Sequence, residues 1–235
     1  MARKRKSGTF RWRRYAVALT LLAGLAGIVW YWWDIQHWVP EEAIYPDQGI
    51  LVSQENGLVG FATVRALGGK FAYIEASTGA SGQDERFARN LAAARDAGLQ
   101  VGVVHRFDPC VSADRQSANF VTMVPRDNSL IQTAIELDRL TDSCPDKVSD
   151  AAMESELLTL INQIEMHVGK PIIIKLSKPF EDRFAVSSAI DRDLWLSRDR
   201  FVPRYTGRPW LLWSANRALN SEASQTPVEW VVVQP

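Results

Sequence analysis

Short apolar segments that alternate with helical patterns dominate the chain from residue 49 onwards. About eight segments rich in β-branched and aromatic residues predict strands, at 49–53, 70–77, 100–105, 130–138, 171–177, 193–197, 209–214 and 228–233. Strands that are apolar along their whole length are buried on both faces, as in parallel sheets covered by helices. We therefore expect an α/β fold, a small irregular (β/α) barrel similar to a TIM barrel. An open doubly wound sheet is the alternative.

Apolar residues recur at helical spacing between these strands. The spacing predicts a helix over 84–99, with Gly98 as its cap, and a second helix from Ser112 to about residue 123. The clearest helix begins at Ser149 and runs to residue 168, where Gly and Pro residues stop it. A short helix is expected around 178–188. These helices fill the intervals that a β/α architecture requires.

An uncharged apolar run occupies residues 15–33 and precedes the folded part. As a helix this run reaches about 28 Å, close to the thickness of a bilayer's hydrocarbon core. Seven of the 27 Lys and Arg residues lie in the basic tail, residues 1–14, and a cluster of Trp and Tyr ends the run. We expect one transmembrane helix with the basic tail in the cytoplasm. A cleaved signal peptide is the alternative.

The remaining chain divides into a stalk at 34–48, polar and with two prolines, and one domain at 49–235. Since seven basic residues lie in the tail, the rest carries 20 basic and 27 acidic residues, a net charge of −7. This balance excludes a nucleic-acid-binding domain. We expect a single-pass protein of the bacterial inner membrane, with the bilayer contacted through 15–33 and the C-terminal domain in the periplasm. No pattern indicates its oligomeric state.

Several common catalytic motifs are absent from the sequence. No G-x-G-x-x-G follows a strand, there is no G-x-S-x-G, and the three histidines lack metal-ligand spacing. We therefore expect no cofactor and no metal site, and carboxylate chemistry is what remains. Cys110 and Cys144 both lie in the exported part, which makes them candidates for a disulfide. Two free thiols are the alternative.

The motifs of the folded part stand in an informative order. The segment 84–107, DERFARNLAAARDAGLQVGVVHRF, follows the pattern D-x-x-F-x-x-N-x-x-x-A-x-x-A-G-L and then V-G-x-Y-H-F. GILVS (49–53) is similar to G-I-D-V-S, FAYIEASTG (71–79) to F-x-Y-I-K-A-T-E-G, IELD (135–138) to L-D-x-E, and PIIIKLS (171–177) to P-x-I-Y-T. In this order the chain resembles glycoside hydrolase family 25 over about residues 47–233. The resemblance implies a β/α barrel of the lysozyme-type muramidases, which cleave peptidoglycan with carboxylates.

The catalytic positions of that family are altered in this chain. Leu51 stands where the first strand has an aspartate, and the D-x-E pair is exchanged to Glu136 and Asp138. Glycoside hydrolysis generally needs one carboxylic acid to protonate the leaving oxygen and a second carboxylate for support. If the pair is active, the resemblance assigns the acid to Asp138 and the supporting base to Glu136. An inert, solvated strand end is the alternative.

Four further residues are candidates for substrate contacts. Glu229 matches the family's closing aspartate, and Glu75 lies on the second predicted strand. His105 follows the V-G-x-Y-H-F pattern, and Trp213 belongs to an apolar strand with a flat ring that can pack on a sugar. A core position is the alternative for both His105 and Trp213.

Two functions remain open from the sequence. The first is a membrane-anchored lysozyme-like hydrolase that acts on peptidoglycan glycan strands, and the retained carboxylate pair favours it. The second is a catalytically degenerate relative that binds cell-wall glycan or a partner in wall synthesis. The loss of the aspartate at Leu51 favours the second.

Overall fold

The computed structural model describes residues 8–235 and divides between Trp38 and Val39 into two compact units. The first is a single helix, α1 (Gly8–His37), whose side chains from Trp12 onwards are mostly exposed. Its stretch Trp12–His37 is long and apolar enough to cross a membrane, a test that a signal sequence also passes. The helix includes residues 34–37, which we expected in the stalk. Residues 1–7 of the basic tail lie outside the described residues.

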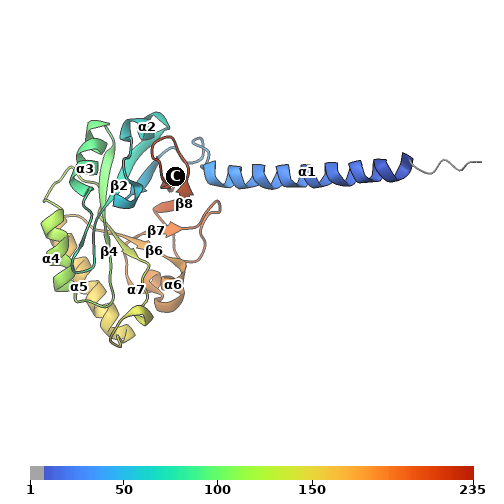
Figure 1. The fold of residues 1–235 in the computed structure, drawn as a ribbon. Coiled ribbons are helices and arrows are strands. Elements are labelled where there is room, and N and C mark those ends of the chain that lie inside the picture. Colours follow the sequence, from blue (N-terminus) through green and yellow to red (C-terminus); the bar gives the residue numbers. More distant parts are fainter. Residues whose placement is uncertain (1–7) are drawn as a thin grey trace, which may run out of the picture. The chain divides into compact units, whose positions relative to one another are not determined.

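The second unit is a closed barrel of eight strands. Its helices lie on the outside of the sheet (Figure 1). Its strands are β1 (Gln48–Val52), β2 (Gly69–Thr78), β4 (Gln100–Arg106), β5 (Ala134–Leu137), β6 (Ile173–Leu176), β7 (Asp193–Ser197), β8 (Leu212–Leu219) and β9 (Val228–Val233). They pair in this order, and β9 closes the barrel against β1. The first seven of these strands are parallel to one another, whereas β9 is antiparallel to both of its neighbours. The fold is therefore a mixed barrel and not an open sheet.

The remaining elements cover the barrel or extend its strands. They are α2 (Phe61–Ala66), α3 (Phe87–Asp96), α4 (Ala113–Met123), α5 (Asp150–Val168), α6 (Lys178–Phe184), α7 (Val186–Ala189), the short strand β3 (Gly82–Gln83) and two 3₁₀ turns, η1 (Gln54–Asn56) and η2 (Thr141–Ser143). α5 has the expected caps: Ser149 accepts the Ala152 N–H, and Gly169 has a φ of 69°. The helix expected at 178–188 is split at Ala185, which has a φ of 50°. We did not expect α2.

The barrel interior contains one apolar layer with a charged layer above it. The apolar layer comprises Leu51, Phe71, Tyr73, Val104, Ala134, Ile173, Trp195, Leu212 and Val231. Alternate residues of a strand face the same side, so the residues two positions after Tyr73, Val104, Ala134 and Ile173 also face inward. These are Glu75, Arg106, Glu136 and Lys175. The strand pattern therefore gathers charges at one end of the barrel. We call the end where the parallel strands finish the mouth.

The segment that leads into the barrel packs at the opposite end from the mouth. Gln48 begins β1, and its amide nitrogen donates to the carbonyl oxygens of Pro40 (3.1 Å) and Tyr45 (2.8 Å). The N–H of Val233 donates to the carbonyl of Asp47 at 2.9 Å. Residues 39–48, which we expected in a stalk, thus belong to the barrel unit. The chain enters this unit at the end away from the mouth.

Candidate active site

Lys175 lies at the centre of the charged layer. Its ammonium is 2.8 Å from Glu136 Oε1 and 3.0 Å from Glu229 Oε1. Lys175 on β6 thus forms ion pairs with carboxylates from β5 and β9. The lysine side chain is 5% exposed and the two carboxylate side chains are each 16% exposed. Lys175 also lies 5.1 Å from the ring centre of Trp195, which the barrel core buries completely. A buried cation therefore occupies the space between two of the predicted site acids.

The second cation of the mouth is Arg106, on β4. Its guanidinium donates to Asp138 Oδ2 at 2.5 Å and lies 3.6 Å from Glu136 Oε2. Arg106 and Asp138 are about one-third exposed, more than Lys175, so they form the outer level of the cluster. The predicted catalytic pair is thus brought together in space, but each member is bound to a cation.

The protonation of Glu136 follows from these neighbours. Burial alone would raise the pKa of Glu136, but the charge and hydrogen bond of Lys175 and the charge of Arg106 outweigh it and hold that pKa below its usual value. Burial likewise opposes the charge of Lys175, yet Glu229 and Glu136 raise the pKa of Lys175 above its usual value. Glu136 is therefore a carboxylate at neutral pH and has no proton to donate.

Glu229 has a second partner besides Lys175. The hydroxyl of Ser214 on β8 donates to Glu229 Oε1 and accepts a 2.7 Å hydrogen bond from Trp195 Nε1. On β1, the backbone of Leu51 pairs with that of Glu229, and the Leu51 side chain belongs to the apolar core of the barrel. The position at which the family pattern has an aspartate thus lies next to the cluster and contributes no charge.

Glu75 is a further carboxylate of the mouth. None of the ion pairs found in residues 8–235 includes it. It accepts a 3.0 Å hydrogen bond from Thr78 Oγ1. Burial raises the pKa of Glu75, and the nearby charge of Arg106 offsets this only in part. The family pattern F-x-Y-I-K-A-T-E-G has a lysine at this position. Compared with that pattern, this chain has a carboxylate on β2 and carries its lysine on β6.

The mouth is held together on one side by loop contacts. Cys110 and Cys144, from the loops after β4 and β5, form a disulfide with a Cα–Cα distance of 5.2 Å. The guanidinium of Arg139 donates to Asp108 Oδ2 at 2.6 Å across the same two loops. The disulfide and this ion pair fix the positions of the loops that follow Arg106 and Asp138.

Two predicted contact residues lie outside the cluster. His105 neighbours the inward-facing Val104 and Arg106, so it points outward and is fully buried between the barrel and α4. Its Nδ1 is 2.8 Å from Ser77 Oγ, and burial lowers the pKa of His105 to about 4. Trp213 alternates with Ser214 on β8, is also buried outside the barrel wall, and donates from Nε1 to the carbonyl of Arg198. The alternation of strand residues places both in the packing outside the barrel, so the geometry does not support substrate contact for either.

Sequence reasoning missed the two cations that define the cluster. Lys175 stands within the otherwise apolar run PIIIKLS, and a lysine on a strand buried on both faces requires a carboxylate partner. That requirement was the available signal, and the structure identifies the partners as Glu136 and Glu229. Arg106, by contrast, follows His105 at a strand end, where an exposed arginine is common.

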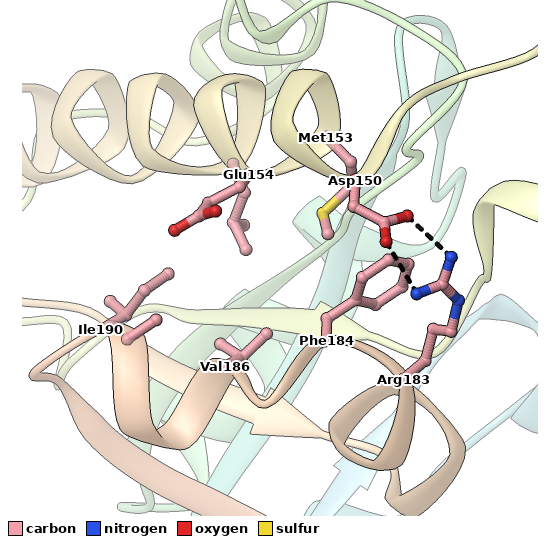
Figure 2. A pocket seen from close by; sticks show the side chains of 9 residues that line it. Asp150, Met153, Glu154, Arg183, Phe184, Val186 and Ile190 are labelled. Atoms are coloured by element: carbon pink, nitrogen blue, oxygen red, sulfur yellow. Dashed lines mark hydrogen bonds and ion pairs between the residues drawn. The ribbon is translucent and has the colours of Figure 1, made fainter.

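A separate pocket lies on the outside of the barrel between α5 and the α6–α7 segment (Figure 2). Met153, Phe184 and Val186 contribute its apolar surface, and a two-fold ion pair between Asp150 and Arg183 crosses one end at 2.7 and 2.8 Å. None of the charged residues of the mouth lines this pocket. The predicted site carboxylates Glu136, Asp138 and Glu229 lie at the barrel mouth, which is therefore the candidate active site.

Carboxylates from several strands at the carboxyl end of a β/α barrel are the arrangement of barrel glycosidases. The profile of "Glycosyl hydrolases family 25" matches residues 50–215. The chain belongs to this family, whose lysozyme-type muramidases it resembles.

Similar proteins agree with this assignment. The barrel resembles a family 25 glycosyl hydrolase from Bacillus anthracis, with a TM-score of 0.76 and 20% identity over 85% of this chain and 93% of that one. A lysozyme from Streptomyces coelicolor gives a TM-score of 0.70 and 20% identity, over 80% and 92% of the two chains. Lysozyme M1 of Streptomyces globisporus is 36% identical over 73 residues, which cover 31% of this chain and 25% of that protein.

Proposed function

We propose that this chain is a membrane-anchored, lysozyme-like family member that binds peptidoglycan glycan strands at the barrel mouth without cleaving them. The observation that carries this proposal is the ion pairing of Lys175 with Glu136 and Glu229. Glycoside hydrolysis needs a carboxyl group that donates a proton and a second carboxylate free to act at the sugar. Here Lys175 and Arg106 neutralise the carboxylates that would perform these steps.

The mouth keeps the chemistry needed to bind sugars. Arg106 and Asp138 are about one-third exposed, and together they offer donors and acceptors to sugar hydroxyls. Fixed ionic groups form stronger hydrogen bonds than neutral ones, and the disulfide between Cys110 and Cys144 holds their loops in place. Binding needs only this fixed arrangement, whereas hydrolysis also needs a movable proton.

The anchor places this binding surface beside the cell wall. We propose that α1 spans the bacterial inner membrane with the basic tail in the cytoplasm and the barrel in the periplasm. Its length and composition support this. Alkaline extraction of membranes tests the anchor: an integral chain stays with the membrane, whereas a chain with a cleaved signal peptide is released.

Pelleting with peptidoglycan tests the main proposal. The full chain in detergent should sediment with insoluble peptidoglycan while the turbidity of the suspension stays constant. Arg106→Gln should weaken sedimentation several-fold, whereas the control Arg95→Gln should not. Arg95 is matched because it also bonds an aspartate at 2.5 Å with a side chain 38% exposed, but on α3. Failure of the wild-type chain to sediment would overturn glycan binding.

Peptidoglycan hydrolysis is the second candidate function. Its supporting observation is Glu75, whose raised pKa favours a protonated acid close to the ionised Glu136. In this case the wild-type chain would release reducing ends from peptidoglycan, and Glu75→Gln would abolish the release without loss of sedimentation. If Asp138, the acid that the resemblance assigns, donates the proton instead, Asp138→Asn would abolish the release without loss of sedimentation.

A further inference from the structure

The loop between β7 and β8 carries an exposed aromatic residue at the rim of the mouth. Phe201 is 64% exposed, more than any other aromatic side chain of residues 39–235, and its neighbour Val202 is 37% exposed. The guanidinium of Arg198 lies 5.3 Å from the centre of the Phe201 ring. Arg204, three residues further on, is exposed as well. We call residues 198–204 the rim loop.

Hydrogen bonds to β8 and to the last residues of β6 and β7 place the rim loop at the mouth. The N–H groups of Arg198 and Arg200 donate to the carbonyls of Ser214 and Ala215, at 3.2 and 2.8 Å. Just after the loop, the Tyr205 hydroxyl donates to the carbonyl of Leu176 at 2.6 Å and accepts from the Ser197 N–H at 2.9 Å. Leu176 and Ser197 are the last residues of β6 and β7. The loop is thus attached where these strands finish.

The backbone of the rim loop is fixed and locally strained. Arg200 has a φ of 65°, a conformation that residues other than glycine seldom adopt and that surrounding contacts must maintain. Asp199 in turn forms a 2.7 Å ion pair with Arg217 of β8. A loop held this firmly displays Phe201 in one place, and pre-organisation of that kind lowers the entropy cost of binding.

The rim loop is net positive, whereas the chain after the basic tail is net negative. Beyond the basic tail the chain has a net charge of −7, whereas the rim loop has three arginines and one aspartate. Arginine binds carboxylates with two parallel hydrogen bonds, and an aromatic ring packs against the apolar face of a sugar ring. The loop therefore offers one contact for a pyranose and nearby contacts for a carboxylate.

We propose that the rim loop is a subsite for peptidoglycan strands that carry carboxylate groups, with Phe201 under a sugar ring and Arg198 and Arg204 on the carboxylates. The subsite extends the binding surface of the mouth and rests on the proposed function. An aromatic residue among arginines also fits an anionic membrane surface. The glycan is favoured because the rim loop begins directly after Ser197, at the mouth that we propose as the glycan-binding surface.

Binding measurements with the full chain in nanodiscs of neutral lipid test this subsite. The probes are soluble uncross-linked peptidoglycan strands with stem peptides, the neutral oligosaccharide chitohexaose, and vesicles that contain phosphatidylglycerol. Phe201→Ala should weaken binding of both glycans by about tenfold, or about 1.4 kcal/mol. Arg204→Ala should weaken only the carboxylate-bearing strands and should reduce the salt dependence of their binding.

Two matched variants serve as controls. Met166→Ala removes an apolar side chain that is 82% exposed on α5, and Arg89→Ala removes an exposed arginine of α3. Both should bind like the wild-type chain. Wild-type binding that neither Phe201→Ala nor Arg204→Ala weakens would overturn the subsite and leave the proposed function intact. Variants that lose only vesicle binding would assign the loop to the membrane, and a wild-type chain that binds no strands would overturn both proposals.

Discussion

Replacement of Lys175 by methionine removes the cation at the centre of the barrel mouth. The side chain keeps nearly the same length, but Glu136 and Glu229 lose the ammonium that lies 2.8 and 3.0 Å away. Removal of one partner from a buried ion pair costs about 3–5 kcal/mol, because a charge remains buried without compensation. We expect Lys175→Met to lower the free energy of unfolding by that amount at pH 7.5.

The loss should depend on pH in a defined direction. In the wild-type chain Lys175 holds the pKa of Glu136 below its usual value, despite burial. Without the lysine, only Arg106 is left to offset burial, so the pKa of Glu136 rises relative to the wild-type chain and the folded variant takes up a proton at a higher pH. The stability difference between the variant and the wild-type chain should therefore be largest at pH 7.5 and should shrink towards pH 4.

Urea denaturation at several pH values, with the disulfide intact, measures this effect. The control is Lys178→Met, whose ion pair with Asp182 is more than half exposed and should contribute less than about 1 kcal/mol. The triple variant Lys175→Met, Glu136→Gln, Glu229→Gln should recover most of the lost stability, since no charge is left unpaired. A pH-independent loss below about 1 kcal/mol for Lys175→Met would refute the reasoning.

Three further predictions concern other parts of the barrel unit. In the wild-type chain His105 is buried and neutral with a pKa near 4, so it should cost on the order of 3 kcal/mol of stability as the pH falls from 6.5 to 4. His105→Gln should remove this loss and flatten the pH dependence, as urea titrations will measure. The double variant Cys110→Ser, Cys144→Ser opens a link over 34 residues and should lose roughly 4 kcal/mol, seen as a lower midpoint of urea denaturation. Glu75→Gln should raise the urea midpoint at pH 7, where the raised pKa of Glu75 makes its charge unfavourable, and should have no effect near pH 3, where the carboxyl is protonated in both states.

Much of the barrel could be predicted from apolar patterns. The strands 193–197 and 228–233 match β7 and β9 at both ends, because each is an apolar run with polar or turn-forming residues on both sides. β5 is shorter than the expected 130–138 and covers Ala134–Leu137. Ile131 before it packs against the apolar core and its N–H donates to the carbonyl of Val101, but residues 130–133 are not part of the strand. The antiparallel direction of β9 could not be predicted, because strand direction is set by pairing and not by composition.

The position of the candidate site could be predicted from the sequence, but the ion pairs of its carboxylates could not. The resemblance located Glu136, Asp138 and Glu229, and the structure brings these residues together through Lys175 and Arg106. The ion pairs depend on which face of a strand each side chain occupies, and a shift of one residue reverses that face. The same alternation carries His105 and Trp213 away from the mouth, although the sequence places them next to residues that face it.

The release of reducing ends in a sample with demonstrated glycan binding tests the central claim most directly. The full chain is pelleted with peptidoglycan between pH 4.5 and 8, and the bound fraction and the reducing ends are measured in the same tube. We predict a bound chain that releases no reducing ends at any pH in this range, because Lys175 is paired with Glu136 and Glu229 and Arg106 is paired with Asp138. Reducing ends that accumulate with the wild-type chain and disappear with Asp138→Asn would contradict the account.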